Sequence, residues 1–312
     1  MPIDVASSIK FTATDTEPTS DKGNVYYDAS ESALKHYNGA AWYQVNVNYV
    51  VVSATGGSSQ THGIYTSYTF TGNGSLTISG GELTSVGVFI LGGGGSGGGG
   101  TGGYHGGGAG GGGWLVATSL ALGTGTYNVV VGAGGAGSNG GNGSDGLSSS
   151  FGKTGEEVTS TGGGGGGSEG GGGRSGHDGG QGGGACYTGD GGDGTLTAPS
   201  GDWTVYSNDG GVGSGSNAPY STGGGGGAGA DGGDGISSAG VGGAGRSNDY
   251  RTGSNVTYSQ GGNGTIPYDI DEDNEGANTG NGSDGTCRAG TSGSGNGGSG
   301  IVVIQIPTAQ LE

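Results

Sequence analysis

The residues best suited to bind a metal ion are aspartates in a short motif that occurs four times. The copies are Asn142–Gly146, Asp190–Gly194, Asp231–Gly235 and Asn281–Gly285, and their recurring aspartates are Asp145, Asp193, Asp234 and Asp284. The first copy lies in GGNGSDGLS, which matches the repeat of calcium-binding β-rolls. Those rolls need tandem copies, whereas these copies are dispersed along the chain. Two hypotheses remain: a calcium site, or tight turns in which each aspartate bonds its own backbone. We predict no cofactor, with calcium as the alternative.

The histidines do not form a recognisable catalytic motif. They are His36, His62, His105 and His177, and they occur in unrelated contexts. Glycine patterns of the nucleotide-binding type recur, as the composition requires, but none continues into a phosphate-binding P-loop. We therefore predict that the protein is not an enzyme. His105 and His177 lie within glycine runs, and we expect both on the surface of a glycine scaffold.

Aromatic residues between the glycine runs are the best candidates for binding. Tyr and Trp supply rigid contact area at a small entropy cost, as they do in antibody loops. The candidates are Tyr187, Trp203, Tyr206, Tyr220, Tyr250, Arg251, Tyr258 and Tyr268. We expect them on surface loops that contact a receptor. The alternative is that these side chains pack against one another.

Glycine, which accounts for 91 of the 312 residues, must supply the element that positions these loops. Glycine loses the most conformational freedom on folding, so an ordered run needs a compensating interaction. In the polyproline II geometry the backbone turns once every three residues and directs its N–H and C=O groups outward. Segments without side chains can then bond neighbours on all sides. We predict such a polyglycine II bundle, with surface loops, over residues 132–300.

The remaining segments predict an all-β fold with little or no helix. Residues 24–28, 33–37 and 41–47 read as strands, with a hairpin turn at Asn38-Gly39. Residues 49–91 alternate polar and apolar side chains and indicate an antiparallel sheet; the sheet part extends to residue 131 and includes the first glycine runs at 92–113. Residues 126–131 and 301–306 are expected to join it. The predicted parts are therefore an N-terminal β-motif (1–48), a sheet (49–131), the glycine-rich bundle (132–300) and a closing strand with a tail (301–312).

Composition excludes several classes of partner. The chain has 8 Lys and Arg against 26 Asp and Glu, a formal net charge of −18. Nucleic acids and anionic membranes both require basic clusters, so we expect neither as a partner. No apolar stretch reaches the roughly 18 residues of a membrane span, and the N-terminus lacks a secretory signal pattern. Cys186 and Cys287 are too few for a disulfide framework.

Two segments resemble known families. The first 48 residues contain a pattern that resembles a short β-motif of bacteriophage tail fibres and other virion proteins. It is carried by Gly23, Tyr26, Tyr27, Asp28, Leu34, Tyr37, Gly39, Trp42 and Val45. Residues 65–306, with VGVFIL, TYNVVVGAGGAG, NGSDGLSSSFG and GGSGIVVIQI, resemble the glycine-rich domain of phage and environmental viral proteins.

The glycine runs and loops also resemble the adhesins at the tips of some phage long tail fibres. In that family, polyglycine II helices form a sandwich whose distal loops bind the host receptor. The resemblance implies a virion fibre or adhesin component, made in the host cytoplasm, in which residues 1–48 attach. Its partners would be other tail or capsid proteins and a host-surface glycan or outer-membrane protein, with a homotrimer as one candidate assembly. A purely structural virion decoration and an ice-binding polyglycine II protein are the alternatives.

Overall fold

The chain divides into two compact units, Met1–Val50 and Val51–Glu312, which are described separately. The computed structural model describes residues 13–14, 24–28, 30–31, 33–45, 51–100, 105–170, 174–215, 220–265, 274–287 and 293–311. The described residues contain no α-helix and one 3-10 turn, Thr308–Gln310. None of their helices is long and apolar enough to cross a membrane. The fold is therefore mostly β, as the sequence predicts.

The first unit is a four-stranded sheet in the order β1-β2-β3-β4. Its strands are Ala13–Thr14 (β1), Val25–Asp28 (β2), Ala33–Tyr37 (β3) and Trp42–Gln44 (β4). The β1–β2 pair is parallel and the other pairs are antiparallel. The predicted hairpin is present: the Asn38 side chain accepts the N–H groups of Ala40 and Ala41, at 2.8 and 3.0 Å. Gly39 has a φ of 101° there, a conformation that favours glycine.

Aromatic packing stabilises this small sheet. The ring of Tyr26 meets that of Trp42 edge-on at 4.7 Å, and the ring of Tyr37 lies 5.3 Å from Trp42. Tyr26 is buried. These three rings therefore pack together on one small sheet, with Tyr26 the most buried of them.

The second unit contains two large sheets and a hairpin. The six-stranded sheet has the order β14-β10-β9-β17-β7-β6, the five-stranded sheet has the order β13-β12-β11-β8-β5, and β15 pairs with β16. The strands are Ser53–Thr55 (β5), Ser58–His62 (β6), Tyr65–Phe70 (β7), Gly74–Ser79 (β8), Leu83–Leu91 (β9), Trp114–Leu122 (β10), Gly125–Val130 (β11), Ser149–Gly152 (β12), Val158–Ser160 (β13), Trp203–Tyr206 (β14), Arg246–Asn248 (β15), Val256–Tyr258 (β16) and Ile301–Pro307 (β17). All of these pairings are antiparallel.

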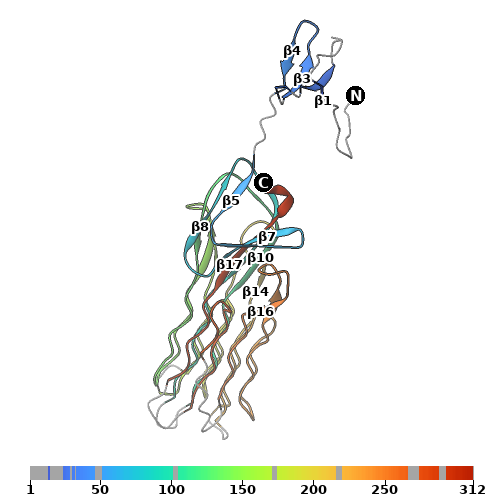
Figure 1. The fold of residues 1–312 in the computed structure, drawn as a ribbon. Helices are drawn as coiled ribbons and strands as arrows, with labels where there is room; N and C mark the ends of the chain where they lie inside the picture. The colour runs from blue at the N-terminus through green and yellow to red at the C-terminus, as the bar shows by residue number, and fades with distance from the viewer. Residues whose placement is uncertain are drawn as a thin grey trace. The chain divides into compact units, whose positions relative to one another are not determined.

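The last strand closes the second unit, as the sequence predicts. β17 lies between β7 and β9, and its Val302 pairs with Phe70 on one side and Ile90 on the other. Figure 1 shows the chain leaving the sheets as extended segments that run side by side and returning to them. The glycine-rich stretch is therefore a series of excursions that begin and end at the same sheets.

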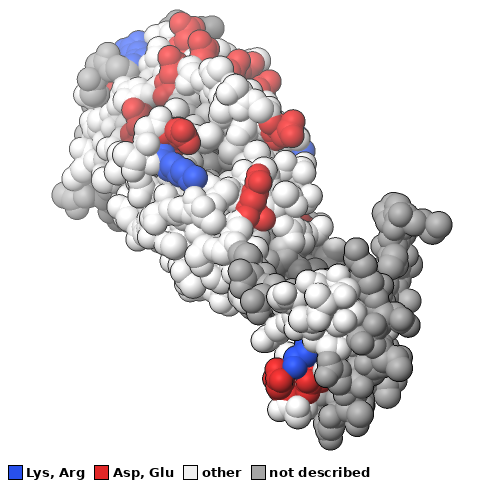
Figure 2. Space-filling view, turned by 90° about the horizontal axis from the view of Figure 1, so that it is seen from above, with Lys and Arg blue, Asp and Glu red and all other residues white. Residues whose placement is uncertain are grey.

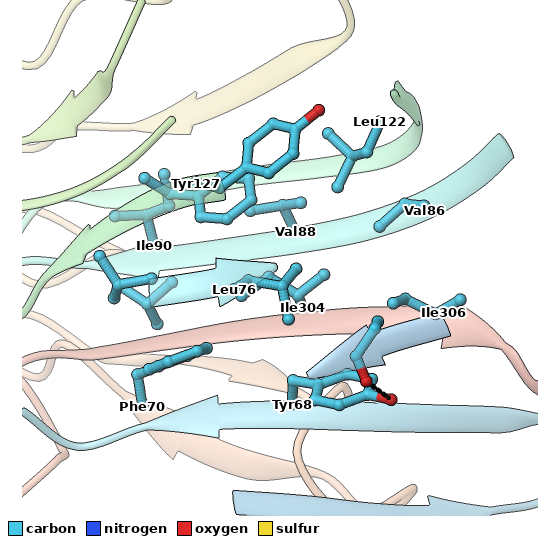
Figure 3. Close-up of a cluster of buried hydrophobic side chains, with 14 of the residues drawn as sticks. Tyr68, Phe70, Leu76, Val86, Val88, Ile90, Leu122, Tyr127, Ile304 and Ile306 are labelled. Carbon is cyan, nitrogen blue, oxygen red and sulfur yellow. Dashed lines mark hydrogen bonds between the residues drawn. The ribbon is translucent and has the colours of Figure 1, made fainter. Parts of the chain in front are cut away.

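The hydrophobic core has two layers because strand side chains alternate between the faces of a sheet. The first layer lies between the two large sheets, where Val88 and Ile304 meet Leu76 and Tyr127 of the five-stranded sheet (Figure 3). The second layer lies on the opposite face of the six-stranded sheet. There Phe89, Trp114 and Val303 pack against Tyr258 of the β15–β16 hairpin.

Along residues 92–99, successive backbone N–H groups point to three sides in turn and bond four neighbouring segments. Gly92, Gly95 and Gly98 donate to the carbonyls of Gly113, Gly110 and Gly107 at 3.0, 2.9 and 2.9 Å. Gly93, Ser96 and Gly99 donate to Leu147, Ser144 and Gly141 at 3.0, 2.9 and 2.9 Å. Gly94 donates to the Gly298 carbonyl at 2.8 Å, and Gly97 to the Ser283 hydroxyl at 3.0 Å. Because the partner changes with a period of three, these segments are held on several sides, whereas a β-strand is bonded on two.

Glycine is required in these segments because neighbouring backbones approach too closely for a side chain. A Cβ atom on Gly164 would overlap the backbone oxygen of His177, and one on Gly225 would overlap that of Ala109. In contrast, a Cβ on Gly72, in the turn before β8, would meet nothing within 4 Å. The high glycine content is thus a packing requirement of the extended segments.

Candidate functional site

Four side chains form a continuous stack near the ends of the extended segments that lie away from the sheets. The rings of Tyr187 and Tyr220 are stacked at 5.5 Å with 12° between their planes. The Arg174 guanidinium lies 4.8 Å from the centre of the Tyr187 ring. On the other side, His105 stacks on Tyr220 at 6.3 Å and 23°. We refer to these four residues as the distal stack.

The extended backbone carries this stack away from the sheets. The segment from His105 leads to Trp114 at the start of β10, and its length corresponds to roughly 28 Å at about 3.1 Å per residue. Tyr187 and Tyr220 both adopt the left-handed conformation, with φ values of 58° and 57°. That conformation is uncommon for residues other than glycine and is found disproportionately at functional sites.

His105 forms the buried base of the distal stack. It is 6% exposed, and burial lowers the pKa of its imidazole while Glu169 acts in the opposite direction. Its Nδ1 is buried without a hydrogen-bond partner among the described residues. Its backbone carbonyl accepts a hydrogen bond from the Cys186 thiol at 2.9 Å. Burial also raises the pKa of Cys186 to about 12, so this cysteine remains a thiol. The expectation of a surface position for His105 is therefore corrected.

The outer part of the distal stack is accessible. Tyr220 is 38% exposed, Arg174 is exposed and Tyr187 is half-buried. Such a surface offers aromatic rings and a guanidinium that can stack on a sugar or aromatic ring, and it suits binding better than proton transfer. Acidic side chains are widespread on the face drawn in Figure 2, where Lys and Arg are fewer. This distribution agrees with the formal net charge of −18.

Three of the other predicted receptor-binding residues lie in strands and contribute to packing. Trp203 and Tyr206 form the ends of β14, where the sequence predicts a loop, and they pair with Ala117 and Trp114 of β10. Trp203 packs against the core between the two large sheets. Tyr258 lies in β16 and is 1% exposed. The expectation of exposed loops is corrected at these positions. Trp203 and Tyr206 are paired with β10 in the sheet, and the Tyr258 side chain is buried.

The remaining predicted residues are at different places. Tyr250 is half-buried over the six-stranded sheet, and its hydroxyl donates to the Ala117 carbonyl at 3.2 Å. Arg251 follows it and is half-buried. Tyr268 lies outside the described residues. Of the eight predicted residues, the structure brings Tyr187 and Tyr220 together in the distal stack.

Three of the four repeated aspartates accept hydrogen bonds from the backbones of neighbouring segments. Asp145 accepts the Gly165 N–H at 2.9 Å, Asp234 the Val212 N–H at 3.0 Å, and Asp284 the Asn263 N–H at 2.6 Å. For Asp193, the structure shows a backbone N–H that donates to Asp178 at 2.8 Å. The predicted turns in which each aspartate bonds its own backbone are thus corrected. In the described ranges, no three His, Cys, Asp or Glu side chains are grouped as a metal site.

The spacing of the polar residues within a copy matches the spacing of the amides that they accept. Asp231 and Asp234 accept the N–H groups of Asp209 and Val212, which are also three apart. The motif therefore caps outward-facing amides of an adjacent segment.

His177 is held by the first copy of the motif. Its Nδ1 lies 2.8 Å from Asp145 Oδ1, and its Nε2 lies 3.1 Å from the Asn142 amide nitrogen. The hydrogen bond with Asp145 raises the pKa of His177, and this outweighs the opposite effect of burial. The His177 side chain is 38% exposed, in agreement with the predicted surface position.

Comparison with known proteins defines the family. A family model described as a glycine-rich domain matches residues 66–307. The chain therefore belongs to this family of glycine-rich domains. No curated protein matches the chain.

Sequence reasoning missed Arg174 and His105 as members of the site. Both interrupt glycine runs, and a bulky side chain in such a run is the signal that could have identified them. Their contacts with Tyr187 and Tyr220 arise from lateral packing of segments that are distant in the sequence, which a linear pattern does not reveal.

Proposed function

We propose that the extended glycine segments form a polyglycine II bundle. The partner of each N–H changes with a period of three along residues 92–99, and the polyproline II backbone turns once every three residues. The close approach of neighbouring backbones at Gly164 and Gly225 supports the same assignment. A bundle of this kind is a rigid frame whose side chains are confined to its edges and its ends.

We further propose that the protein is a fibre or adhesin component of a bacteriophage virion and that the distal stack contacts a host-surface receptor. The observation that carries this proposal is the accessible Arg174–Tyr187–Tyr220 arrangement at the end of a rigid frame. Residues 1–48 attach to the virion in this proposal, in keeping with their resemblance to virion β-motifs. The receptor is a glycan or an outer-membrane protein.

The test is adsorption of the purified full chain to a panel of bacterial strains. The test variant is Tyr187→Ala combined with Tyr220→Ala. The control is Tyr43→Ala, since Tyr43 is a 52% exposed tyrosine of β4 in the first unit. We expect the wild type and the control to bind the same strains and to block phage adsorption to them, and the double variant to lose at least tenfold in binding.

Two results would contradict the proposal. Equal binding by the double variant and the wild type would remove the distal stack from the receptor site. Absence of wild-type binding to every strain that supports phage adsorption would favour a structural virion decoration.

A further inference from the structure

A second candidate binding site lies on the six-stranded sheet, at the end away from the glycine segments. It is a pocket of about 730 Å³, within the range of ~300–1,000 Å³ that is usual for small-ligand sites. The β6–β7 turn, strands β9, β10 and β17, and the loop at 249–253 line it. It shares no residue with the distal stack.

A polar side chain that has no partner among the described residues lines this pocket. Gln305 of β17 pairs with Ser67 of β7 and Gly87 of β9 through its backbone. It is only 8% exposed, and its side-chain amide makes no hydrogen bond to any other residue in the described ranges. Its amide atoms are not sealed from solvent, so they face the open space of the pocket, where a ligand can hydrogen-bond them.

The loop over the pocket is fixed before any ligand binds. His62 Nε2 lies 3.1 Å from the Tyr250 carbonyl and 2.8 Å from the Ser67 hydroxyl, and Ser67 also donates to that carbonyl. A Cβ on Gly87 would meet the Tyr250 ring at 2.8 Å, so glycine at this position lets the ring lie against the sheet. A fixed wall reduces the ordering cost of binding.

The two strands beside the pocket are irregular where they line it. Ser85 in β9 has a φ of 54°, and the pairing of β10 with β9 shifts register between Ala117 and Leu120, next to the lining residue Thr118. Bulges of this kind re-aim side chains and are over-represented beside binding and active sites. Here they lie beside Ser85 and Thr118 in the lining of the pocket.

The chemistry of the lining fits a hydroxyl-rich ring. Tyr65 and Tyr250 supply aromatic surface, Gln305 supplies both a donor and an acceptor, and Thr118 supplies a hydroxyl. Asp249 provides the only carboxylate among the described lining residues, and it accepts hydrogen bonds only. Its charge and the net charge of −18 disfavour an anionic ligand. We infer that this pocket binds a neutral saccharide, with Gln305 and Asp249 bonding its hydroxyl groups.

The experiment uses the full chain on an array of neutral and sialylated oligosaccharides, followed by calorimetric titration of the bound compounds. Gln305→Met keeps the length of the side chain and removes its hydrogen bonds. The matched control is Gln60→Met, because Gln60 is exposed on β6, the edge strand of the same sheet, and does not line the pocket. Asp249→Ala, at an exposed rim position, provides a second test that does not disturb the core.

We expect neutral saccharides to bind and sialylated ones not to bind. Gln305→Met should weaken binding at least tenfold while its melting temperature stays close to that of the wild type, since the amide makes no hydrogen bond within the described residues that would be lost. Asp249→Ala should also weaken binding, and Gln60→Met should not. Absence of binding to every neutral saccharide, preference for sialylated ones, or wild-type affinity in Asp249→Ala or in folded Gln305→Met would overturn the inference.

Discussion

The substitution Gly164→Ala tests whether the glycine segments are packed against one another. The new Cβ would overlap the backbone oxygen of His177, so the two segments must separate. Gly164 donates to Gln181 at 2.9 Å and accepts from Gly110 at 2.8 Å, and both bonds would be strained or broken. A buried backbone group left without a partner costs about 1–3 kcal/mol, so two broken bonds give about 2–6 kcal/mol of destabilisation. This is a large share of the ~5–15 kcal/mol that stabilises a typical domain.

Urea unfolding followed by tryptophan fluorescence measures the change, because Trp114 is buried where the segments join β10. The matched control is Gly72→Ala, where a Cβ meets no atom within 4 Å; we expect its free energy of unfolding to lie within about 0.5 kcal/mol of the wild-type value. If Gly164→Ala were as stable as Gly72→Ala, the glycine runs would be spacers and the reasoning would be refuted.

Three further predictions concern side chains. Tyr258→Ala should lower the free energy of unfolding by about 3–5 kcal/mol in urea titrations, because it leaves a cavity against Phe89 and Trp114; wild-type stability would contradict its place in the core. Asp234→Ala should cost about 0.5–1.5 kcal/mol in the same assay through loss of one backbone cap; an unchanged midpoint would count against the capping role. The His177 pKa, measured by NMR titration, should lie above 6.5 and fall in Asp145→Asn. The ion pair between protonated His177 and Asp145 therefore stabilises the fold below pH 6.5, and this contribution is lost as the pH rises through the folded-state pKa of His177. A His177 pKa that Asp145→Asn leaves unchanged would refute this role of Asp145.

Local patterns predict those strands that alternate clearly or are joined by tight turns. The hairpin at Asn38-Gly39 and the closing strand β17 are both predicted, because turn chemistry and a dense run of β-branched residues act locally. Strand β10, with the sequence WLVATSLAL, was not predicted since its alternation is interrupted. Strand β14 has four residues between polar neighbours and forms through its pairing with β10, which is a long-range interaction.

The candidate site was predictable only in part for the same reason. Tyr187 and Tyr220 follow from their residue type and their position between glycine runs. Whether Arg174 and His105 join the stack depends on which segments lie side by side. Glycine runs have no side chains that would reveal, from the sequence, which segments are neighbours. For Tyr258 the prediction was wrong. Its residue type and its position between glycine runs predict a surface loop, whereas its ring packs against Phe89 in the core.

Amide hydrogen exchange of the intact protein tests the central claim most directly, namely that the glycine segments form an ordered, laterally bonded frame. In residues 92–99 the structure assigns every N–H a partner in a neighbouring segment. These amides should therefore exchange as slowly as those of strand β9, although they belong to neither a helix nor a strand. Exchange at the rate of an unstructured glycine chain would contradict the account.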